Sequence, residues 1–390
     1  MITVAQALEA VLSLGTPLDT EVVPLRHASG RVLREAVTAE RAQPPFSSSA
    51  MDGYAIQDAD HVAGNTLRVI GEAAAGHRFE GVVQQGQAVR IFTGAPLPHG
   101  ATRVVIQEDV TVGDSSITLG TSLEAATHVR PAGGDFKQGH VVKAPKRLTP
   151  ADVALLASMN IAEVTVSRRP AVALLATGDE LVMPGEAPND DQIIASNTFG
   201  LAAMLEAAGA TARMLPIARD NEASLRQSFD LARGADLIVT VGGASVGDHD
   251  LVGAVAADMG LERAFYKVAM RPGKPLMAGK ISGMAMLGLP GNPVSAMVCG
   301  EIFLKPLIDQ MLGLPATARE TITAPTNKII PANGPREHYM RGRYRDGTVK
   351  VFDRQDSSLL KVLHVANCLI KRAPHAPEIA VGAPVEIILI

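Results

Sequence analysis

The sequence predicts a multidomain α/β plus β protein, in which a doubly wound parallel-sheet domain lies between two β-rich domains. Three observations support this fold class. Apolar strands alternate with amphipathic helices over residues 170–316, short strands separated by glycine and proline occupy residues 43–145, and a β pattern returns over residues 317–390. Strand–helix alternation is typical of a parallel sheet with right-handed crossovers, whereas short, closely spaced strands are typical of small β domains.

Composition excludes several classes of protein. The chain has 390 residues, 47% of them hydrophobic and 19% charged, which allows two to four domains with large cores. The net charge of −4 and the lack of tryptophan argue against a nucleic-acid binder, because such domains are usually basic or offer aromatic stacking platforms. No apolar run approaches the roughly 20 residues that span a bilayer, so we expect no membrane partner.

The cysteines and the N-terminus favour a cytoplasmic protein. Cys299 and Cys368 lie in apolar stretches without the spacing of a metal site or a disulfide framework. We therefore expect both thiols to be buried as small hydrophobic side chains, as is usual in a reducing compartment. The first residues show no basic region or cleavage site of a secretion signal.

The region before residue 170 is expected to contain a linking segment and a β-rich domain. Residues 1–42 predict a helix, a short strand and a second helix, and together with residues 146–169 they form the linking segment. That second part should contain a helix at Leu148–Met159 and a strand at Glu163–Val166. The expected strands of the β-rich domain, residues 43–145, are Leu67–Gly71, Ala88–Thr93, Arg103–Gln107, Ser116–Leu119 and His128–Arg130.

The α/β domain, residues 170–316, and the C-terminal domain, residues 317–390, have clearer patterns. The predicted α/β strands are Ala171–Thr177, Ala212–Ile217, Asp236–Val241 and Met284–Leu289, and the helices are Asn197–Gly209, Glu222–Arg233, Asp250–Met259 and Pro293–Met311. Segments Ala264–Ala269 and Leu276–Ala278 predict a hairpin or a pair of edge strands. The C-terminal strands Tyr339–Tyr344, Thr348–Phe352, Asn367–Lys371 and Val385–Ile390 predict a small closed sheet or barrel.

Four loops with polar residues follow the predicted α/β strands, at residues 177–181, 218–220, 242–248 and 289–293. In a parallel sheet these loops emerge at one carboxyl edge, which is where open α/β sheets bind ligands. Their acids and glycine turns, with cations nearby, suit a phosphorylated ligand and a divalent metal.

Two of these loops, at residues 242–248 and 289–293, are typical of substrate-binding turns before a helix. In the loop at 242–248, glycine lets backbone N–H groups approach an anion at the start of the helix near Asp250, although an ordinary strand–helix turn is the alternative. The loop at 289–293 offers a tight turn and a proline at the first helical position, with a hydroxyl in the first turn of the helix that follows, and a rigid helix start explains this pattern equally well. The candidate binding residues are Gly242, Gly243, Ser245, Gly247, Asp248, Pro290, Asn292, Pro293 and Ser295.

Charged residues near the same edge suggest a metal and an oxyanion. Clustered carboxylates are costly unless they bind a cation, so Glu180 and Asp220 are candidate Mg²⁺ ligands, with solvated helix caps as the alternative. A second set, Lys267, Arg271 and Lys274, brings three cations into eight residues and could hold a phosphate or another oxyanion. A solvated hairpin face is the alternative for these cations.

Seven segments together resemble the molybdopterin molybdenumtransferase family (MoeA and the gephyrin E domain). They are PPFSSSAMDGYA at 44–55, IFTGAPLPHGA at 91–101, VRPAGGDFKQG at 129–139, LLATGDEL at 174–181, VGGASVGDHD at 241–250, MRPGKP at 270–275 and GLPGNPVSA at 288–296. The resemblance runs nearly from end to end, and seven motifs in family order are highly specific. By themselves, the motifs around Asp52, Thr93 and Asp135 would be interpreted as turns.

The resemblance implies an activity and an assembly. Such enzymes use magnesium, take adenylylated molybdopterin and molybdate as substrates, insert molybdenum at the dithiolene and release AMP. They are homodimers whose cleft lies between the α/β domain of one subunit and the N-terminal β domain of the other. The matching site residues are Asp52, Thr93, Asp135, Glu180, Asp220, Asp250, Lys267, Arg271, Pro290 and Pro293.

Two departures from the family pattern affect the expected site. Arg271 stands where a lysine is common, and a planar guanidinium binds an oxyanion with a different geometry from an ammonium. The turn before Asn197 reads Ile194-Ala195-Ser196, where the family usually has an acidic or threonine-containing turn.

Three functions remain open at this point: the molybdenum-inserting transferase, the molybdopterin adenylyltransferase of the preceding step, and a gephyrin-like scaffold. The additional N- and C-terminal domains argue against the second, and the acids at positions 52, 180 and 220 argue against the third. The implied protein partners are a second copy of this chain, the adenylyltransferase and the enzymes that accept the cofactor.

Overall fold

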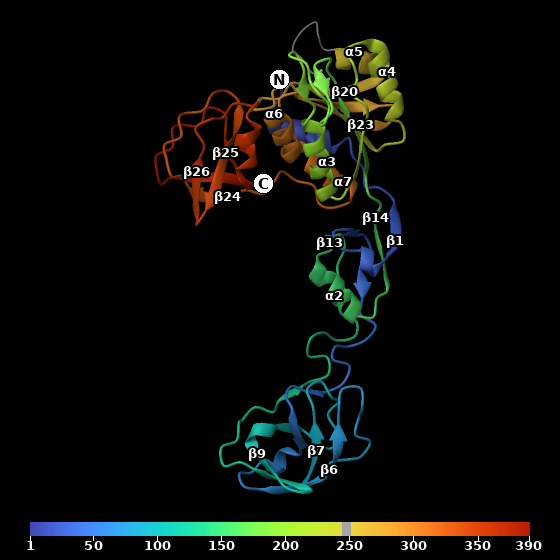
Figure 1. The fold of residues 1–390 in the computed structure, drawn as a ribbon, viewed down its shortest axis with the longest axis vertical. Coiled ribbons are helices and arrows are strands. Elements are labelled where there is room, and N and C mark those ends of the chain that lie inside the picture. Colours follow the sequence, from blue (N-terminus) through green and yellow to red (C-terminus); the bar gives the residue numbers. More distant parts are fainter. Residues whose placement is uncertain (244–250) are drawn as a thin grey trace.

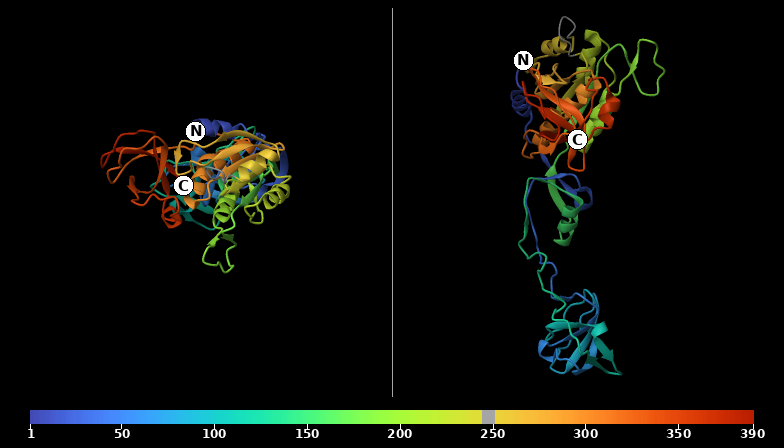
Figure 2. Two further views of the ribbon diagram at one scale, coloured as in Figure 1. Left: turned by 90° about the horizontal axis from the view of Figure 1, so that it is seen from above. Right: turned by 90° about the vertical axis from the view of Figure 1, so that its left-hand side faces the viewer.

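The chain forms an elongated molecule with its two largest parts at opposite ends (Figures 1 and 2). The computed structural model describes residues 1–243 and 251–390. An α/β unit (residues 170–316) and a C-terminal barrel (residues 317–390) lie side by side at one end, and a β-rich unit (residues 43–145, the N-terminal β unit) lies at the other. An arm of two chain segments (residues 20–42 and 146–169) connects them.

The α/β unit is built on a six-stranded sheet. Across the sheet the strands are β18 (Thr211–Met214), β15 (Ala171–Ala176), β19 (Leu237–Val241), β23 (Met284–Leu289), β22 (Met277–Ile281) and β20 (Leu261–Tyr266). The first four are parallel to one another, whereas β22 is antiparallel to both of its neighbours. The predicted edge pair is thus confirmed as β20 and β22, and it makes the sheet mixed rather than wholly parallel. Since β20 runs in the direction of the parallel strands, the connection from β20 to β22 leaves at the same carboxyl edge as the loops after β15, β19 and β23.

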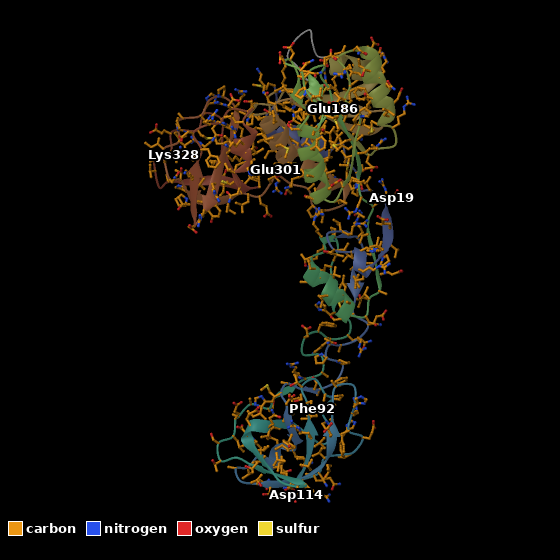
Figure 3. The ribbon with its side chains drawn as sticks, viewed as in Figure 1. Asp19, Phe92, Asp114, Glu186, Glu301 and Lys328 are labelled. Atoms are coloured by element: carbon orange, nitrogen blue, oxygen red, sulfur yellow. The ribbon has the colours of Figure 1, made fainter. Side chains whose placement is uncertain are left out.

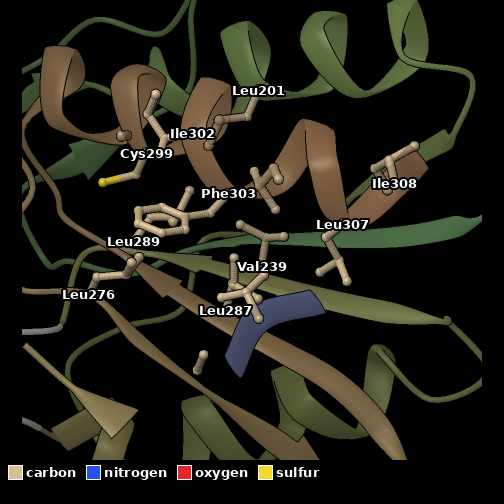
Figure 4. Packing of buried hydrophobic residues seen from close by; sticks show 14 of the residues in the cluster. Leu201, Val239, Leu276, Leu287, Leu289, Cys299, Ile302, Phe303, Leu307 and Ile308 are labelled. Carbon is tan, nitrogen blue, oxygen red and sulfur yellow. The ribbon is translucent and has the colours of Figure 1, made fainter. Parts of the chain in front are cut away.

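Helices cover both faces of this sheet, as expected for a doubly wound fold. One face packs against α3 (Asn197–Ala207), α6 (Pro293–Cys299), α7 (Lys305–Met311) and the N-terminal helix α1 (Val4–Leu12), and the other packs against α4 (Glu222–Leu231) and α5 (Leu251–Asp258). Strand residues alternate between the two cores: Leu174 and Val239 face the first, whereas Leu175 and Ile238 face the second. Figure 4 shows the first core, where Phe303 and Leu307 lie over Leu287.

Two helix predictions need correction. The predicted helix Pro293–Met311 is interrupted by a π turn, η4 (Gly300–Leu304), between α6 and α7. The second helix predicted within residues 1–42 is wrong: residues 25–42 hold only the single 3₁₀ turn η1 (Leu25–His27) and two short strands. Those strands pair with segments more than 100 residues later in the chain, at Val32–Arg147 and Val37–Val142, so tertiary pairing overrides local helical pattern.

The arm is a small sheet with one helix against it. Its strands, in order, are β1 (Thr20–Pro24), β14 (Glu163–Ser167), β2 (Val32–Leu33) and β13 (Lys146–Arg147), with α2 (Pro150–Ser158) beside them and the pair β3 (Val37–Thr38) and β12 (Val141–Val142) toward the N-terminal β unit. Arg168 fixes the arm to the α/β unit through two 2.8 Å hydrogen bonds to the Asp236 carboxylate. Arg147 adds a 2.9 Å bond to Asp309. These contacts give the arm a defined direction where it leaves the α/β unit.

The N-terminal β unit is a six-stranded sheet, and two of its strands were not among those predicted. The order is β8 (Arg103–Ile106), β5 (Gly53–Ile56), β7 (Gln87–Ile91), β6 (Thr66–Ala73), β10 (Ser116–Leu119) and β9 (Val110–Val112), with 3₁₀ turns η2 (Asp58–Asp60) and η3 (Gln107–Asp109) and a separate pair β4 (Ser48–Ser49) and β11 (Val129–Arg130). The two strands that were not predicted are β5 and β9. Gly53 belongs to β5 rather than to a tight turn, because a Cβ at this position would lie 1.9 Å from the Val105 carbonyl oxygen of the neighbouring strand.

The C-terminal unit is a closed sheet, as predicted. Its main strands are β25 (Glu337–Arg345), β27 (Cys368–Arg372), β28 (Pro384–Leu389) and β24 (Ile322–Pro325), and β26 (Thr348–Val351) pairs with β25. A bridge between Thr326 and Val349 joins the two outer strands and closes the barrel. The short helix α8 (Leu360–His364) lies beside α6, and strand β21 (Met270–Arg271) of the α/β unit pairs with β25. The barrel is therefore joined directly to the cationic segment of the α/β unit.

The expectations for the cysteines and for membrane-spanning helices can be compared with the structure. Cys299 and Cys368 are free thiols and fully buried, as expected. In residues 1–243 and 251–390, no helix is long and apolar enough to cross a bilayer.

Candidate active site

A cavity of about 900 Å³ opens at the carboxyl edge of the α/β sheet. Its walls come from the ends of β15, β19 and β23, from the start of α3 and from the short pair β16 (Leu181–Val182) and β17 (Ile193–Ile194). The predicted residues that line it are Glu180, Asp220, Gly242, Gly243, Pro290, Asn292 and Pro293. The expected meeting of four loops at one edge is therefore observed for the described part of each loop.

Two acids from different loops face this cavity. Glu180 follows β15 and Asp220 follows β18, and both side chains are exposed. Asp179 supports the second acid, since its carboxylate accepts the Asp220 N–H at 3.2 Å. Glu180 folds back over Gly178, where a Cβ would lie 2.4 Å from a Glu180 carboxylate oxygen. This glycine leaves the space that the Glu180 carboxylate occupies.

Glu180 and Asp220 could hold a magnesium ion only together with water and substrate oxygens. Among the described residues, no group of three or more His, Cys, Asp or Glu side chains is placed to hold a metal ion. Two carboxylates are nevertheless a common protein contribution to Mg²⁺, because the ion takes its remaining oxygen ligands from water and from substrate phosphates. Glu180 and Asp220 would be those two ligands.

The glycine turn after β19 requires glycine at both described positions. Gly242 and Gly243 have φ values of 94° and 64°, which L-residues with a side chain rarely adopt. A Cβ at Gly242 would lie 2.7 Å from the Thr177 carbonyl oxygen, and one at Gly243 would lie 2.2 Å from the Val252 side chain. The turn is thus packed between β15 and α5. Ser245, Gly247, Asp248 and Asp250 lie outside the described residues.

The Pro290–Pro293 turn is held from two sides. Asn197, the first residue of α3, donates its side-chain N–H to the Gly291 carbonyl at 2.6 Å. Asn292 donates to the Ser357 hydroxyl at 3.1 Å, which connects the turn to the C-terminal barrel. Pro293 occupies the first turn of α6, as predicted. Ser295 does not line the cavity, because it lies on the buried side of α6 with 4% exposure.

The three predicted cations lie at the same edge of the sheet but outside the cavity lining. Lys267, Arg271 and Lys274 belong to the connection from β20 to β22. This connection is fixed by Ile2, which donates to the Lys267 carbonyl at 3.3 Å and accepts from Ala269 at 2.8 Å. On its other side, β21 pairs with β25 of the barrel.

The barrel adds cations that were not among the predicted site residues. Arg341 on β25 is completely buried, and its Nε and Nη1 have no hydrogen-bond partner in the described part of the chain. Burial, together with the charge of Arg271, lowers the pKa of Arg341 to about 10. Burial and then Arg271 likewise lower the pKa of His338, which pairs with Arg271 in the backbone register, to about 4. Arg341 thus has two unused donors in the described part of the chain and feels the charge of Arg271, an arrangement that an oxyanion would stabilise.

Asp52 and Thr93 form a pair at the far end of the molecule. One Asp52 carboxylate oxygen accepts both the Thr93 N–H, at 2.7 Å, and the Thr93 hydroxyl, at 2.9 Å. These two bonds lower the pKa of Asp52. Asp135 is on the connection between β11 and β12, and within the described residues no hydrogen bond joins it to Asp52 or Thr93.

The N-terminal pair and the cavity are far apart within one chain. Figure 3 labels Phe92, next to Thr93, in the N-terminal β unit, and Glu186 in the α/β unit close to β16; the whole arm lies between them. Asp52 and Thr93 therefore cannot reach the cavity of their own chain without a large rearrangement of the arm.

Residues from distant parts of the sequence complete the cavity wall. Asn197 and Ser358 both line it, although neither was among the predicted site residues. Asn197 has a side-chain amide and lies at the start of a helix, which is a weak signal in the sequence. Ser358 lies in a short turn of the C-terminal unit, and no sequence pattern marks that turn. Only the packing of the barrel against α6 brings Ser358 to the cavity.

The fold and the cavity define a class of protein, one with an α/β ligand-binding unit carried between an N-terminal β unit and a C-terminal barrel. Family models match the chain in this order: the MoeA N-terminal region (domain I and II) over residues 2–160, a probable molybdopterin binding domain over residues 173–310, and the MoeA C-terminal region (domain IV) over residues 323–390. The chain belongs to the molybdopterin molybdenumtransferase (MoeA) family.

Individual relatives agree along the whole chain. A molybdopterin molybdenumtransferase of Haemophilus influenzae is 36% identical, with 99% of this chain and 98% of the relative covered. Molybdopterin molybdenumtransferase 2 of Mycobacterium tuberculosis is 35% identical, with 94% of each chain covered. The crystal structure of the molybdopterin biosynthesis MoeA protein of Pyrococcus horikoshii matches with a TM-score of 0.84 at 27% identity, over 100% of both chains.

Proposed function

We propose that this protein inserts molybdenum from molybdate into adenylylated molybdopterin, with release of AMP. The observation that carries the proposal is the cavity in which Glu180 and Asp220 face the glycine turn and the Pro290–Pro293 turn, in a chain of this family. A cavity of about 900 Å³ is within the usual range for sites that bind molecules of substrate size.

The acids and turns of the cavity suit the phosphate end of the substrate. Mg²⁺, when bound by Glu180 and Asp220, would polarise the pyrophosphate that joins AMP to the pterin. The N–H groups of the Gly242–Gly243 turn would donate to phosphate oxygens. The Asn197 amide and Ser357 hold the opposite turn in place, so the walls of the cavity need little reorganisation when the substrate binds.

The cations at the same edge suit molybdate, a dianion. Lys267, Arg271 and Lys274 lie on the one connection from β20 to β22, and Arg341 adds a buried guanidinium that feels the charge of Arg271. Separate binding sites for the phosphates and for molybdate would explain how two anionic ligands occupy neighbouring positions without strong repulsion.

We assign Asp52, Thr93 and Asp135 to the cavity of a second copy of the chain. The support is the length of the arm, which keeps the Asp52–Thr93 pair away from its own cavity (Figure 1). In a homodimer, the N-terminal β unit of each subunit would then cover the cavity of the other. The reaction is placed in the cytoplasm, with the adenylyltransferase as the source of substrate and cofactor-accepting enzymes as the recipients of product.

Measurement of AMP release tests the proposed function. Purified protein is incubated with adenylylated molybdopterin and Mg²⁺, with and without molybdate. AMP release that requires molybdate supports the proposal. Adenylylation of molybdopterin by ATP would instead identify an adenylyltransferase, and the lack of both activities would favour a scaffold.

A further inference from the structure

Arg90 lies beside Asp52 in the N-terminal β unit, and the proposed chemistry does not account for it. Arg90 is on β7, directly opposite Tyr54 of β5 in the antiparallel register. Its guanidinium carbon lies 5.0 Å from the centre of the Tyr54 ring and 4.9 Å from the centre of the Phe92 ring. Contact with two aromatic rings restricts the orientation of this cation.

Hydrogen bonds connect Arg90 to both sides of the bend that carries Asp52. Its Nη2 donates to the Gln107 side-chain oxygen at 2.6 Å, and its Nη1 reaches the Gly53 carbonyl at 3.4 Å. Gln107 in turn donates its backbone N–H to the Asp52 carbonyl at 3.1 Å. The Arg90 guanidinium therefore joins Gly53, which follows Asp52, to Gln107, which donates a hydrogen bond to the Asp52 backbone.

Within the part of the chain that the structure describes, the positive charge of Arg90 is not used in an ion pair. Arg103 in the same unit forms a 2.7 Å ion pair with Asp58, whereas Arg90 has no such carboxylate partner in residues 1–243 and 251–390. After the two Thr93 hydrogen bonds, Arg90 is the charged group that further lowers the pKa of Asp52. Its unpaired charge thus acts on Asp52 in addition to its hydrogen bonds.

We propose that Arg90 is a positioning residue for Asp52, which fixes the bend that presents this carboxylate and supplies positive charge beside it. The inference rests on the proposed function, because it takes Asp52 to act in the cavity of a second subunit. The elements that flank the bend also carry Tyr54, Arg68, Glu72, Arg103, Glu108, Asp109 and Arg130, and His128 precedes β11. Arg103 is paired with Asp58, and Arg90 is the charged group that lowers the pKa of Asp52, so we take Arg90 as the main source of positive charge for this carboxylate.

The test compares pH profiles of kcat and of kcat/KM for AMP release in the full-length protein. The variants are Arg90→Met, which removes the charge, and Arg90→Lys, which keeps the charge but loses the planar, two-armed hydrogen bonding. Arg78→Met is the matched control, because Arg78 also lies over an aromatic ring, Phe46 at 5.9 Å, but has no hydrogen bond to the Asp52 bend in the described part of the chain. Asp52→Asn is measured in the same series.

Arg90→Met is expected to lower kcat about tenfold at neutral pH, because Asp52 loses its fixed orientation. Its acidic limb should also move to higher pH: without the neighbouring charge the pKa of Asp52 rises, so the carboxylate is protonated earlier as the pH falls. Arg90→Lys should lower kcat with an unmoved acidic limb, and Arg78→Met should match the wild-type profile.

The results separate the role of Arg90 from the assignment of Asp52 and from the proposed function. If Asp52→Asn is inactive but Arg90→Met keeps the wild-type rate and acidic limb, the role of Arg90 is refuted while the proposed function stands. If Arg90→Met does not fold, Arg90→Lys decides, since a wild-type kcat in that variant also refutes the role. An active Asp52→Asn variant would instead contradict the assignment of Asp52, and the inference about Arg90 would fail with it.

Discussion

The α/β unit and the N-terminal β unit present their acidic residues in opposite ways. Glu180 and Asp220 line a cavity whose other walls are turns and helix starts, so a ligand there meets the protein on several sides. Asp52 lies on an exposed bend and is held by Thr93 and by the Gln107 backbone. The first arrangement can surround a ligand, whereas the second holds one carboxylate in place on an exposed surface. This difference is what supports the proposed divided site, in which the N-terminal β unit would contribute a group to the cavity of a second copy.

The largest effect is expected from the acids of the cavity. Glu180→Gln and Asp220→Asn should each lower the rate of AMP release about a hundredfold or more, which corresponds to roughly 2.7 kcal/mol of transition-state stabilisation, because each removes a charge that would hold the metal. Circular dichroism should show an unchanged fold. Glu186→Gln, an exposed acid on the neighbouring loop that does not line the cavity, is the control. Near-normal rates in the two cavity variants would remove these acids from the mechanism.

A mixing experiment tests whether the two units act across subunits. Asp52→Asn and Glu180→Gln proteins, each inactive alone, should regain activity when their subunits exchange, because in a mixed dimer one cleft carries both changes and the other carries none. Random equal mixing makes half of the dimers mixed, so about a quarter of the wild-type rate is expected.

Subunit exchange must be shown independently, for example with fluorescently labelled subunits, since a tight interface exchanges slowly. Activity that stays at the level of the single variants after confirmed exchange would mean that each site is built within one chain. In that case the arm would have to bend.

The cations of the α/β unit should affect one ligand more than the other. Lys267→Ala and Arg271→Ala are expected to raise the molybdate concentration for half-maximal rate about tenfold, since each removes a charge from the proposed oxyanion-binding site. Binding of adenylylated molybdopterin should change less. Separate titrations of the two ligands measure this, with Lys280→Ala, a cation on β22 away from the cavity, as the control. An unchanged dependence on molybdate would assign the cations another role.

The smallest effect concerns the contact between the barrel and the α/β unit. Burial, followed by the charges of Arg271 and Arg341, lowers the pKa of His338 from 6.5 to about 4. The unfolded chain therefore takes up a proton below pH 6.5 that the folded protein takes up only near pH 4, so stability is present above pH 6.5 and is lost as the pH falls through this window.

His338→Gln should make the protein less sensitive to acid. Between pH 7 and pH 5, the wild type should lose about 2 kcal/mol more unfolding free energy than this variant. Thermal or chemical unfolding at the two pH values measures the difference, and His364→Gln, at an exposed position, should behave like the wild type. Equal losses in all three proteins would show that His338 titrates normally.

The elements and motifs of the cavity could be predicted largely because they are local. A continuous apolar strand followed by a polar loop is visible in the sequence, and parallel strands must send such loops to one edge. Glu180, Asp220, Gly242 and Pro293 were therefore placed together correctly. Ser295 was misplaced, because a hydroxyl in a first helical turn can face either the cavity or the core, and the packing of α6 turns it inward.

The tertiary structure decided what depends on contacts between distant segments. Arg341 and Ser358 reach the α/β unit only because the barrel packs against it, and no periodicity in residues 317–390 predicts this contact. Likewise β5 is a strand because Gly53 lets two backbones approach closely, although Asp-Gly is locally a turn signal. The sequence by itself determined the fold class, the family and the acids of the cavity, since these follow from local pattern and composition. The separation of Asp52 from that cavity depends on the arm, whose pairings span more than 100 residues, and such long-range pairings are set by the packing of the whole chain.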